Sequence, residues 1–424
     1  MKLEKAGVAT VTVVTDAFLD LGREVAAALG AADIGIAVVP HPLGELQREQ
    51  VVERARRAFP DIMRALQAPG ARTAAPSSDT QPRVLELTGS WEKINARFYA
   101  AGWTDGLPVV PPVASRVAAF IAAAGLAPDE VIGVIPPRMG IATAEKIAVN
   151  AVMAGCEPAH FPVVIAAVKA ICAPEFNLLP MQATTNPVTP LLIINGPIAQ
   201  RLEVNGGCNV FGQGWKSNAT IGRALRFVLV NIGGGAPGKL DHACHGQPGK
   251  YSFCIAENEA ANPWQPFHVE RGYAASDSTV SVIGVAGTQD IIHYARTSAD
   301  QILNTLVQAI PREGFKNLYS GGEPLLVFGP EQAAILAAGG LSKKDVKCAF
   351  FERTQVPLAL LNPATISLLS GRRAKWFEKG APAAIPIADS EDHVQIIVAG
   401  GAGNHTAFLP TWGDTRCITV RIEA

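Results

Sequence analysis

The chain has 424 residues, of which 48% are hydrophobic and 17% are charged, and its formal net charge is −1. This length is sufficient for two or three domains around a large core. No basic excess exists to neutralise phosphates, which excludes nucleic acid as the expected partner. The composition therefore predicts a folded protein that acts on a small molecule.

No apolar segment predicts a membrane span. The longest apolar runs, residues 113–127 and 161–173, are interrupted by Arg116 and Lys169 and are shorter than the ~18–20 residues that cross a bilayer. The first residues lack the pattern of a signal peptide. Seven cysteines without framework spacing favour reduced thiols. We therefore expect a cytoplasmic protein without a membrane partner.

The N-terminal residues predict a small α/β segment. Residues 8–14 are rich in β-branched side chains and predict a strand, which is followed by a helix over 17–30 and a second strand over 34–40. Residues 46–66 show helical spacing with charge on the outer face. We therefore expect a β-α-β-α segment over residues 1–67.

The remainder predicts one large mixed α/β domain, residues 84–424, behind a linker of small, polar and proline residues at 68–83. Helices are expected at 88–101, 113–125, 142–154 and 161–172. Strands are expected at 189–197, 226–232, 278–286, 323–330 and 394–401. No internal repeat is evident. The fold class is therefore α/β, with a small segment followed by a large domain.

Two motifs in the first segment carry a family resemblance. "VVTDAF" (residues 13–18) and "VVPHPLG" (residues 38–44) resemble the UGSC-like family, which is named for a Sec/Cys-Gly-Ser-Cys motif. The large region resembles the companion region of such proteins in stretches such as "GWTDGLPVVPP" and "PGKYSFCIAENE". The resemblance implies a shared fold and an enzyme.

The half of the family that bears the Cys motif has no counterpart in this sequence. A β-α-β-α unit without neighbours exposes a sheet edge and a hydrophobic face, which is unfavourable unless a partner covers them. We therefore expect either a small subunit that bears the Cys motif or homo-oligomerisation through this segment.

Residues 240–259 gather histidines, cysteines and carboxylates. His242, His245 and Glu257 are candidate metal ligands, because imidazole and carboxylate suit zinc or iron. However, no C-x-x-C or H-E-x-x-H pattern is present. The same histidines also suit a loop in which backbone groups satisfy them. The pattern therefore leaves a metal site open.

The same residues also predict a thiol site. Cys244 is flanked by His242 and His245, and neighbouring imidazoles stabilise the nucleophilic thiolate. Cys208 lies among glycines whose backbone N–H groups are suited to bind an anion. Cys254 lies in an expected strand, where it is either a further catalytic thiol or a small core residue.

Several polar side chains in Gly/Pro-rich loops are candidate substrate ligands. They are Thr185, Asn186, Asn209, Asn218, Arg223 and Lys239. Amides near an arginine suit recognition of a carboxylate, although Asn and Thr also serve as turn and cap residues. Lys239 closes a G-x-x-x-x-G-K pattern at 233–239 that lacks the following Ser or Thr. This favours a simple oxyanion cradle over a nucleotide site.

Together these features predict an enzyme that acts on a small, carboxylated molecule. The expected chemistry is a thiol-assisted lyase or oxidoreductase reaction at a carbon–heteroatom bond. Two alternatives stay open at this point. One is a metal-dependent hydrolase or lyase, and the other is a non-catalytic scaffold subunit for a partner with the Cys motif.

Overall fold

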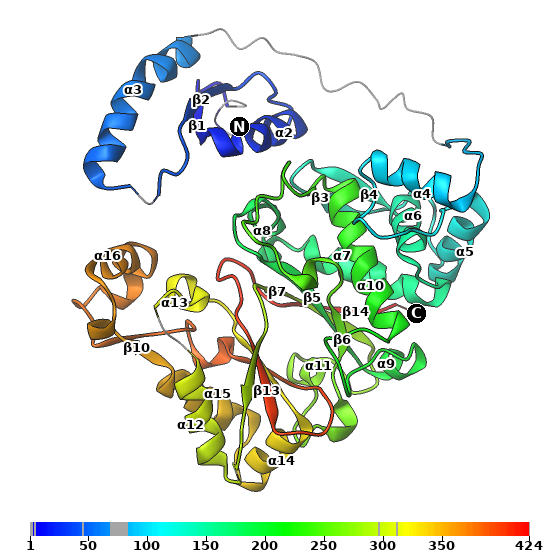
Figure 1. The fold of residues 1–424 in the computed structure, drawn as a ribbon, viewed down its shortest axis with the longest axis vertical. Coiled ribbons are helices and arrows are strands. Elements are labelled where there is room, and N and C mark those ends of the chain that lie inside the picture. Colours follow the sequence, from blue (N-terminus) through cyan, green and yellow to red (C-terminus); the bar gives the residue numbers. More distant parts are fainter. Residues whose placement is uncertain are drawn as a thin grey trace.

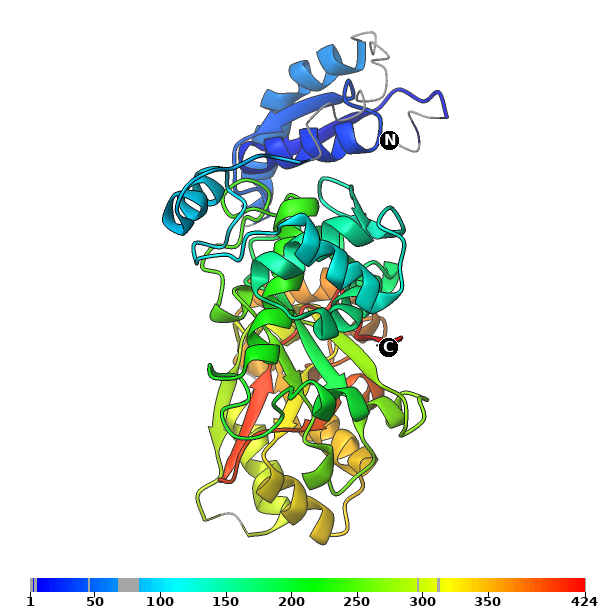
Figure 2. The same cartoon turned by 90° about the vertical axis from the view of Figure 1, so that its right-hand side faces the viewer.

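The N-terminal segment forms a small parallel sheet at one end of the molecule (Figures 1 and 2). The computed structural model describes residues 3, 6–44, 46–67, 84–295, 297–310 and 313–423. Strand β1 (Val11–Thr15) pairs in parallel with β2 (Gly35–Val39). Helix α2 (Leu19–Ala28) connects the two strands, and α3 (Arg48–Gln67) follows. The expected β-α-β-α order is confirmed.

The expected linker, residues 68–83, lies outside the described residues. Beyond it the four expected helices are confirmed as α4 (Trp91–Ala100), α5 (Ala114–Ala124), α6 (Ala144–Ala154) and α7 (Phe161–Ile171). Strands β3 (Val131–Ile135) and β4 (Gly140–Thr143) form an antiparallel hairpin before α6. The helices that follow are α8 (Leu178–Ala183), α9 (Pro197–Arg201) and α10 (Lys216–Phe227).

The first large sheet has the strand order β14-β7-β5-β6. Its strands are β5 (Thr189–Asn195), β6 (Cys254–Ala256), β7 (Thr279–Val285) and β14 (Ile418–Arg421). Strand β6 is parallel to β5, β7 is antiparallel to β5, and β14 is antiparallel to β7. The short helix α11 (Phe267–Glu270) lies between β6 and β7 along the chain.

The second large sheet has the order β12-β9-β13-β8. Its strands are β8 (Gln289–Ile292), β9 (Leu325–Phe328), β12 (Gln395–Val398) and β13 (His405–Leu409). Between them lie α12 (Ala299–Ala309), α13 (Lys316–Ser320), α14 (Pro330–Ala338), α15 (Lys343–Arg353) and α16 (Pro363–Arg372). Strands β10 (Gln355–Pro357) and β11 (Ala384–Pro386) form a separate two-stranded antiparallel sheet, with α16 between them along the chain.

The two large sheets pack face to face, with helices on both outer sides. In β5 the side chains alternate: Leu191 and Ile193 pack against the second sheet, whereas Leu192 and Ile194 pack against α6, α7 and α10. Strand β9 alternates in the same way between the inner core and α12, α14 and α15. The large region is therefore a four-layer α/β/β/α arrangement. Figure 1 shows α6, α7 and α10 on one side of the strands and α12, α14 and α15 on the other.

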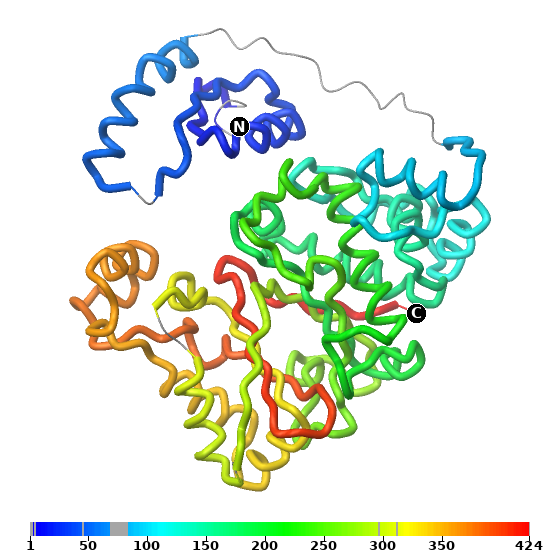
Figure 3. The backbone as a smooth tube through the Cα atoms, viewed as in Figure 1, coloured from blue at the N-terminus to red at the C-terminus, as the bar shows by residue number. Residues whose placement is uncertain are grey.

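The two sheets repeat one topology and exchange a strand. Each has a central strand (β5 or β9) with one parallel neighbour (β6 or β12) and one antiparallel neighbour (β7 or β13). The strand that follows leaves its own sheet: β8 pairs with β13, and β14 pairs with β7. Figure 3 shows the red C-terminal trace crossing back to the first sheet. This repeat is one of strand arrangement, and no repeated sequence pattern marks it.

One expected strand is helical instead. Residues 226–232 form the end of α10 and a π-helical turn, Val228–Ile232. The run of apolar residues there is mostly buried, and a short buried run has the same pattern in a helix as in a strand. The G-x-x-x-x-G-K pattern at 233–239 therefore follows a helix, which removes the strand that a phosphate-binding loop requires.

Among the described residues, no single helix is long and apolar enough to cross a membrane. The consecutive segments Pro158–Ile171 and Pro174–Ala183 reach the required length and hydropathy only when taken together, and they are bent by 74°.

Candidate functional site

The loop of residues 240–250, called the histidine–cysteine loop below, is held in place at several points. Asp241 is buried and forms an ion pair with Lys250 at 2.6 Å. The side-chain amide of Gln247 donates to the carbonyl of Val285 at the end of β7, at 2.8 Å. The loop is therefore anchored to the first large sheet.

The loop places its imidazoles and thiol differently. Cys244 and His245 are exposed, whereas His242 is half-buried. The Nε2 atom of His242 is buried and has no hydrogen-bond partner among the described residues. The ring of His242 packs edge-on against Phe18 with the ring centroids 4.9 Å apart. The loop thus contacts the N-terminal segment through an imidazole with an unused nitrogen.

Phe18 belongs to a cluster at the carboxyl ends of β1 and β2. The Thr15 hydroxyl lies 3.1 Å from Nδ1 of His41, and the Asp16 carboxylate accepts from the backbone N–H of His41 at 3.0 Å. The rings of Phe18 and His41 lie 5.7 Å apart. Carboxyl ends of parallel strands commonly carry ligand-binding residues. Both family motifs therefore meet at one edge, which faces the histidine–cysteine loop.

A second contact joins the N-terminal segment to the glycine-rich stretch before this loop. Arg138 lies 3.5 Å from Glu24 of α2, and its backbone N–H donates to the carbonyl of Gly233 at 2.9 Å. Both side chains are about half exposed, so the ion pair contributes little stability. It does place α2 beside Arg138, which contacts the glycine-rich stretch.

The structure brings one predicted substrate ligand to Cys244. The backbone N–H of Cys244 donates to the carbonyl of Thr185 at 2.9 Å. The amide of Asn186 is used locally, because it donates to the Thr184 hydroxyl at 2.8 Å. Lys239 is exposed in a tight turn of the same loop region. Thr185 and Lys239 thus stay candidates for contact with a ligand.

Arg223 does not fit the expected role in substrate binding. Its guanidinium forms two hydrogen bonds to the Asp105 carboxylate, at 2.7 and 2.8 Å, and donates to the carbonyl of Pro108 at 3.0 Å. The side chains of both members of the ion pair are largely buried. Arg223 therefore fixes the loop before α5, and its charge is already balanced.

Asn218 also serves the fold rather than a ligand. Its amide donates to the carbonyls of Asn205 and Cys254, both at 3.0 Å, and its side-chain oxygen accepts from the backbone of Asn205 at 2.8 Å. All three interactions are buried. These contacts use both N–H groups of the Asn218 amide and one acceptor position of its oxygen, so they give Asn218 a role in the fold and no support to the expected contact with substrate.

Cys208 and Asn209 lie in a different loop. Cys208 is exposed and lies against Gly401, where a Cβ atom would come within 3.3 Å of the Cys208 sulfur. Asn209 adopts a left-handed backbone with φ of 55°, and its side chain donates to the carbonyl of Gln213 at 2.9 Å. The contacts of Asn209 are those of a turn residue.

Cys254 does not suit a nucleophile. It is buried among α6, α7 and α10, and burial raises the pKa of its thiol far above the ordinary value. Burial likewise raises the pKa of Cys156 and Cys417 to about 12 and that of Cys172 to about 11. These thiols stay protonated at neutral pH, and their role is packing.

Glu257 and Glu259 bind the same side-chain amide. The Asn195 amide donates to both carboxylates, at 2.6 and 2.9 Å. Glu257 is buried and also accepts from the backbone of Phe267 at 2.7 Å and from the Asn262 amide at 2.8 Å. Glu257 therefore organises the turn between β6 and α11.

This arrangement does not bring the expected metal ligands, His242, His245 and Glu257, together. Glu257 is saturated by three donors in a buried network, whereas His242 packs on Phe18. Within the described part of the chain, no group of three or more His, Cys, Asp or Glu side chains is placed to hold a metal ion. The residues proposed for zinc or iron therefore do not fit one site.

Glu257 makes stability depend on pH. Burial raises the pKa of Glu257 above its ordinary value of 4.5, and the charge of Lys343 and the hydrogen bonds only partly offset this. The native state then holds this proton more tightly than the unfolded state. The free energy of unfolding of the wild type should therefore fall, relative to Glu257→Gln, as the pH rises above 4.5.

Urea denaturation at a series of pH values measures this free energy, and Glu270 is a control whose effect on it has the opposite pH dependence. Burial would raise the pKa of Glu270, but Lys343 and Lys347 hold it below 4.5. The contribution of the ionised Glu270 to the free energy of unfolding should be present above pH 4.5 and lost as the pH falls below that value. Equal pH profiles for the wild type and Glu257→Gln would contradict the assignment of Glu257.

Reasoning from sequence missed the residues at the strand ends. Thr15, Asp16, Phe18 and His41 lie in the two motifs that carry the family resemblance, yet no role was predicted for them. The signal was present, because each motif directly follows an expected strand. The contact with His242 was not predictable, since it joins positions far apart in the sequence.

Comparisons with known proteins support the family resemblance of the first segment. No curated protein matches the chain at a significant level, and no solved structure does so. The resemblance of residues 90–400 to the companion region stays a prediction. Residues 1–68 match the UGSC family, so the chain carries a UGSC-like segment at the N-terminus of a larger protein.

Proposed function

We propose that the protein is an enzyme with a thiol site formed jointly by the histidine–cysteine loop and the strand ends of the UGSC-like segment. The observation that carries this proposal is the packing of His242 against Phe18 at 4.9 Å. It brings the exposed Cys244 region to an edge that already holds Thr15, Asp16 and His41. Function at strand ends is common in α/β proteins.

The proposed reaction is a lyase or oxidoreductase reaction at a carbon–heteroatom bond of a small carboxylated molecule. In the lyase form, His242 or His245 accepts the thiol proton of Cys244, the thiolate forms a C–S bond as the carbon–heteroatom bond breaks, and the imidazolium returns the proton to the leaving heteroatom. The imidazole then removes a proton from the neighbouring carbon, the C–S bond breaks as a carbon–carbon double bond forms, and the thiolate takes the proton back. The exposed ammonium group of Lys239 is suited to pair with the substrate carboxylate. Thr15 and His41 supply further polar contacts.

The proposal predicts that Cys244 is the most reactive thiol of the chain. Cys208 is an internal control, because it is also exposed but has no histidine beside it in the sequence. At neutral pH, iodoacetamide should alkylate Cys244 faster than Cys208, and the double variant His242→Ala/His245→Ala should abolish the difference. Peptide mass spectrometry measures both rates in one sample. Equal rates in the wild type would contradict the thiol site.

A scaffold role is the second candidate, and the open edge of β1 favours it. Among the described strands β1 pairs only with β2, and Val13 of β1 is 48% exposed. Helix α3 exposes Val52, Phe59, Met63 and Leu66, whose spacing places them along one side of the helix. Such an edge and apolar side are suited to a second copy of the chain or to a small subunit with the Cys motif.

This second candidate predicts association through the N-terminal segment. The full chain should elute from gel filtration as an oligomer, and Phe59→Glu with Met63→Glu should shift it to the monomer. Arg57→Glu, an exposed change on the same helix, is the matched control and should leave the oligomer intact. A well-behaved wild-type monomer would contradict the scaffold proposal.

A further inference from the structure

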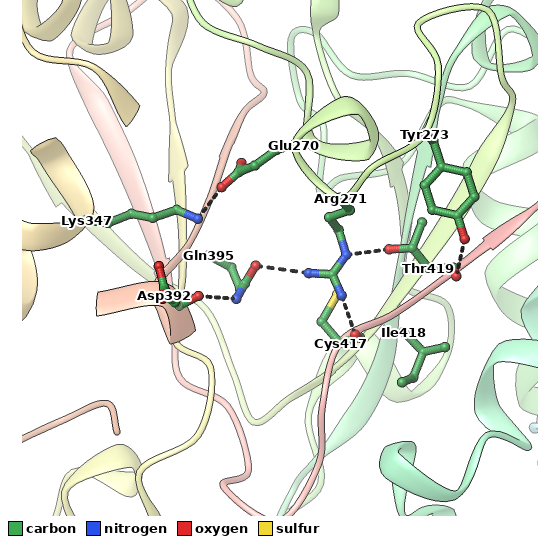
Figure 4. A pocket seen from close by; sticks show the side chains of 9 residues that line it. All are labelled: Glu270, Arg271, Tyr273, Lys347, Asp392, Gln395, Cys417, Ile418 and Thr419. Carbon is green, nitrogen blue, oxygen red and sulfur yellow. Dashed lines mark hydrogen bonds and ion pairs between the residues drawn. The ribbon is translucent and has the colours of Figure 1, made fainter. Parts of the chain in front are cut away.

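A polar pocket of about 520 Å³ lies where β14, an edge strand of the first large sheet, comes near β12, an edge strand of the second (Figure 4). Cys417 and Thr419 line it from the side of the first sheet, and Gln395 at the start of β12 lines it from the second. Arg271 and Tyr273, just after α11, and Lys347 of α15 complete its wall. None of these residues belongs to the thiol site proposed above.

Arg271 is fixed in the pocket by neutral acceptors alone. Its Nε donates to the Thr419 hydroxyl at 2.7 Å, and its Nη2 donates to the carbonyl of Cys417 at 2.6 Å. A longer contact of 3.4 Å joins Nη1 to the side-chain oxygen of Gln395. Within the described residues no carboxylate forms an ion pair with Arg271. A guanidinium has five N–H donors, so donors and the positive charge are left for a ligand.

The surroundings hold Arg271 in a defined orientation. The guanidinium carbon lies 5.3 Å from the centre of the Phe267 ring, which supports one face of the guanidinium. The Tyr273 hydroxyl donates to the carbonyl of Thr419 at 2.8 Å, and the Thr419 hydroxyl lies 2.8 Å from that of Ser281. A charged donor held in this way binds an anion with little loss of side-chain entropy.

The charged side chains that line the pocket balance in number. Lys343 and Lys347 both pair with Glu270, so two ammonium groups share one carboxylate. Asp392 also lines the pocket and forms no ion pair among the described residues. Lys343 does not line the pocket, so the lining carries two positive charges, Arg271 and Lys347, and two negative ones, Glu270 and Asp392. Because Lys347 is paired with Glu270, the guanidinium of Arg271 is the group that favours an anion, and the two carboxylates disfavour a highly charged one such as a phosphate dianion.

We propose that this pocket binds a small organic carboxylate, whose oxygens accept hydrogen bonds from the remaining N–H groups of Arg271. The planar fork of a guanidinium matches a carboxylate in a way that a lysine does not. Because the pocket is lined from both sheets, a bound carboxylate bridges the two halves of the large region. The pocket shares no residue with the proposed thiol site, so a failure of one proposal does not affect the other.

Calorimetric titration of the full chain tests the proposal. Acetate and succinate should bind saturably and raise the melting temperature, whereas the uncharged amides acetamide and succinamide should do neither. Arg271→Gln should weaken succinate binding on the order of tenfold or more, as expected for a lost charged hydrogen bond. The control Arg353→Gln removes an exposed guanidinium paired with Asp300 and should leave binding unchanged.

Two further comparisons keep the test decisive if Arg271→Gln fails to fold. Arg271→Lys retains the charge but loses the fork, and it should weaken succinate binding severalfold. In the wild type, inorganic phosphate should bind more weakly than succinate. Amides that bind as well as carboxylates, phosphate that binds better than succinate, or unaltered binding by the folded Arg271 variants would each overturn the proposal.

Discussion

The exchange of β8 and β14 between the two large sheets is the constraint on which the large region depends. Each sheet receives its outermost antiparallel strand from the other half of the sequence, so neither half completes its sheet alone. The inner faces of both sheets then share one apolar core, to which β5 contributes Leu191 and Ile193 and β9 contributes Leu325 and Val327. Burial of such side chains drives folding, and the exchange makes that burial common to both halves.

This arrangement decides where polar groups collect. The end of β7 holds the histidine–cysteine loop through Gln247, and the junction of β14 with β12 holds Arg271 in its pocket. Strand β12 begins near β14, at one edge of the first sheet. Its last residue, Val398, accepts a hydrogen bond from the backbone N–H of Asn258, which follows β6 at the opposite edge. Strand β12 therefore crosses the first sheet instead of running along one of its strands. The two candidate sites therefore lie at different places on the same strand framework.

The sequence predicted local patterns well and long-range convergence poorly. The continuous apolar runs and the Gly-Pro that ends each of them at residues 189–197 and 323–330 identified β5 and β9, and the α/β class followed from such elements. In contrast, Arg223 and Asn218 resembled ligand-binding residues because their partners, Asp105 and Asn205, are brought to them only by tertiary packing. Buried helix and buried strand also share one composition at 226–232.

The central claim is that the UGSC-like segment and the histidine–cysteine loop form one site. The most direct test is the rate of Cys244 alkylation at neutral pH in Phe18→Ala, with Cys208 of the same molecule as the reference. Loss of the Phe18 ring removes the contact that orients His242, so the account predicts a severalfold slower reaction of Cys244 and an unchanged reaction of Cys208. An unchanged ratio of the two rates would contradict the joint site.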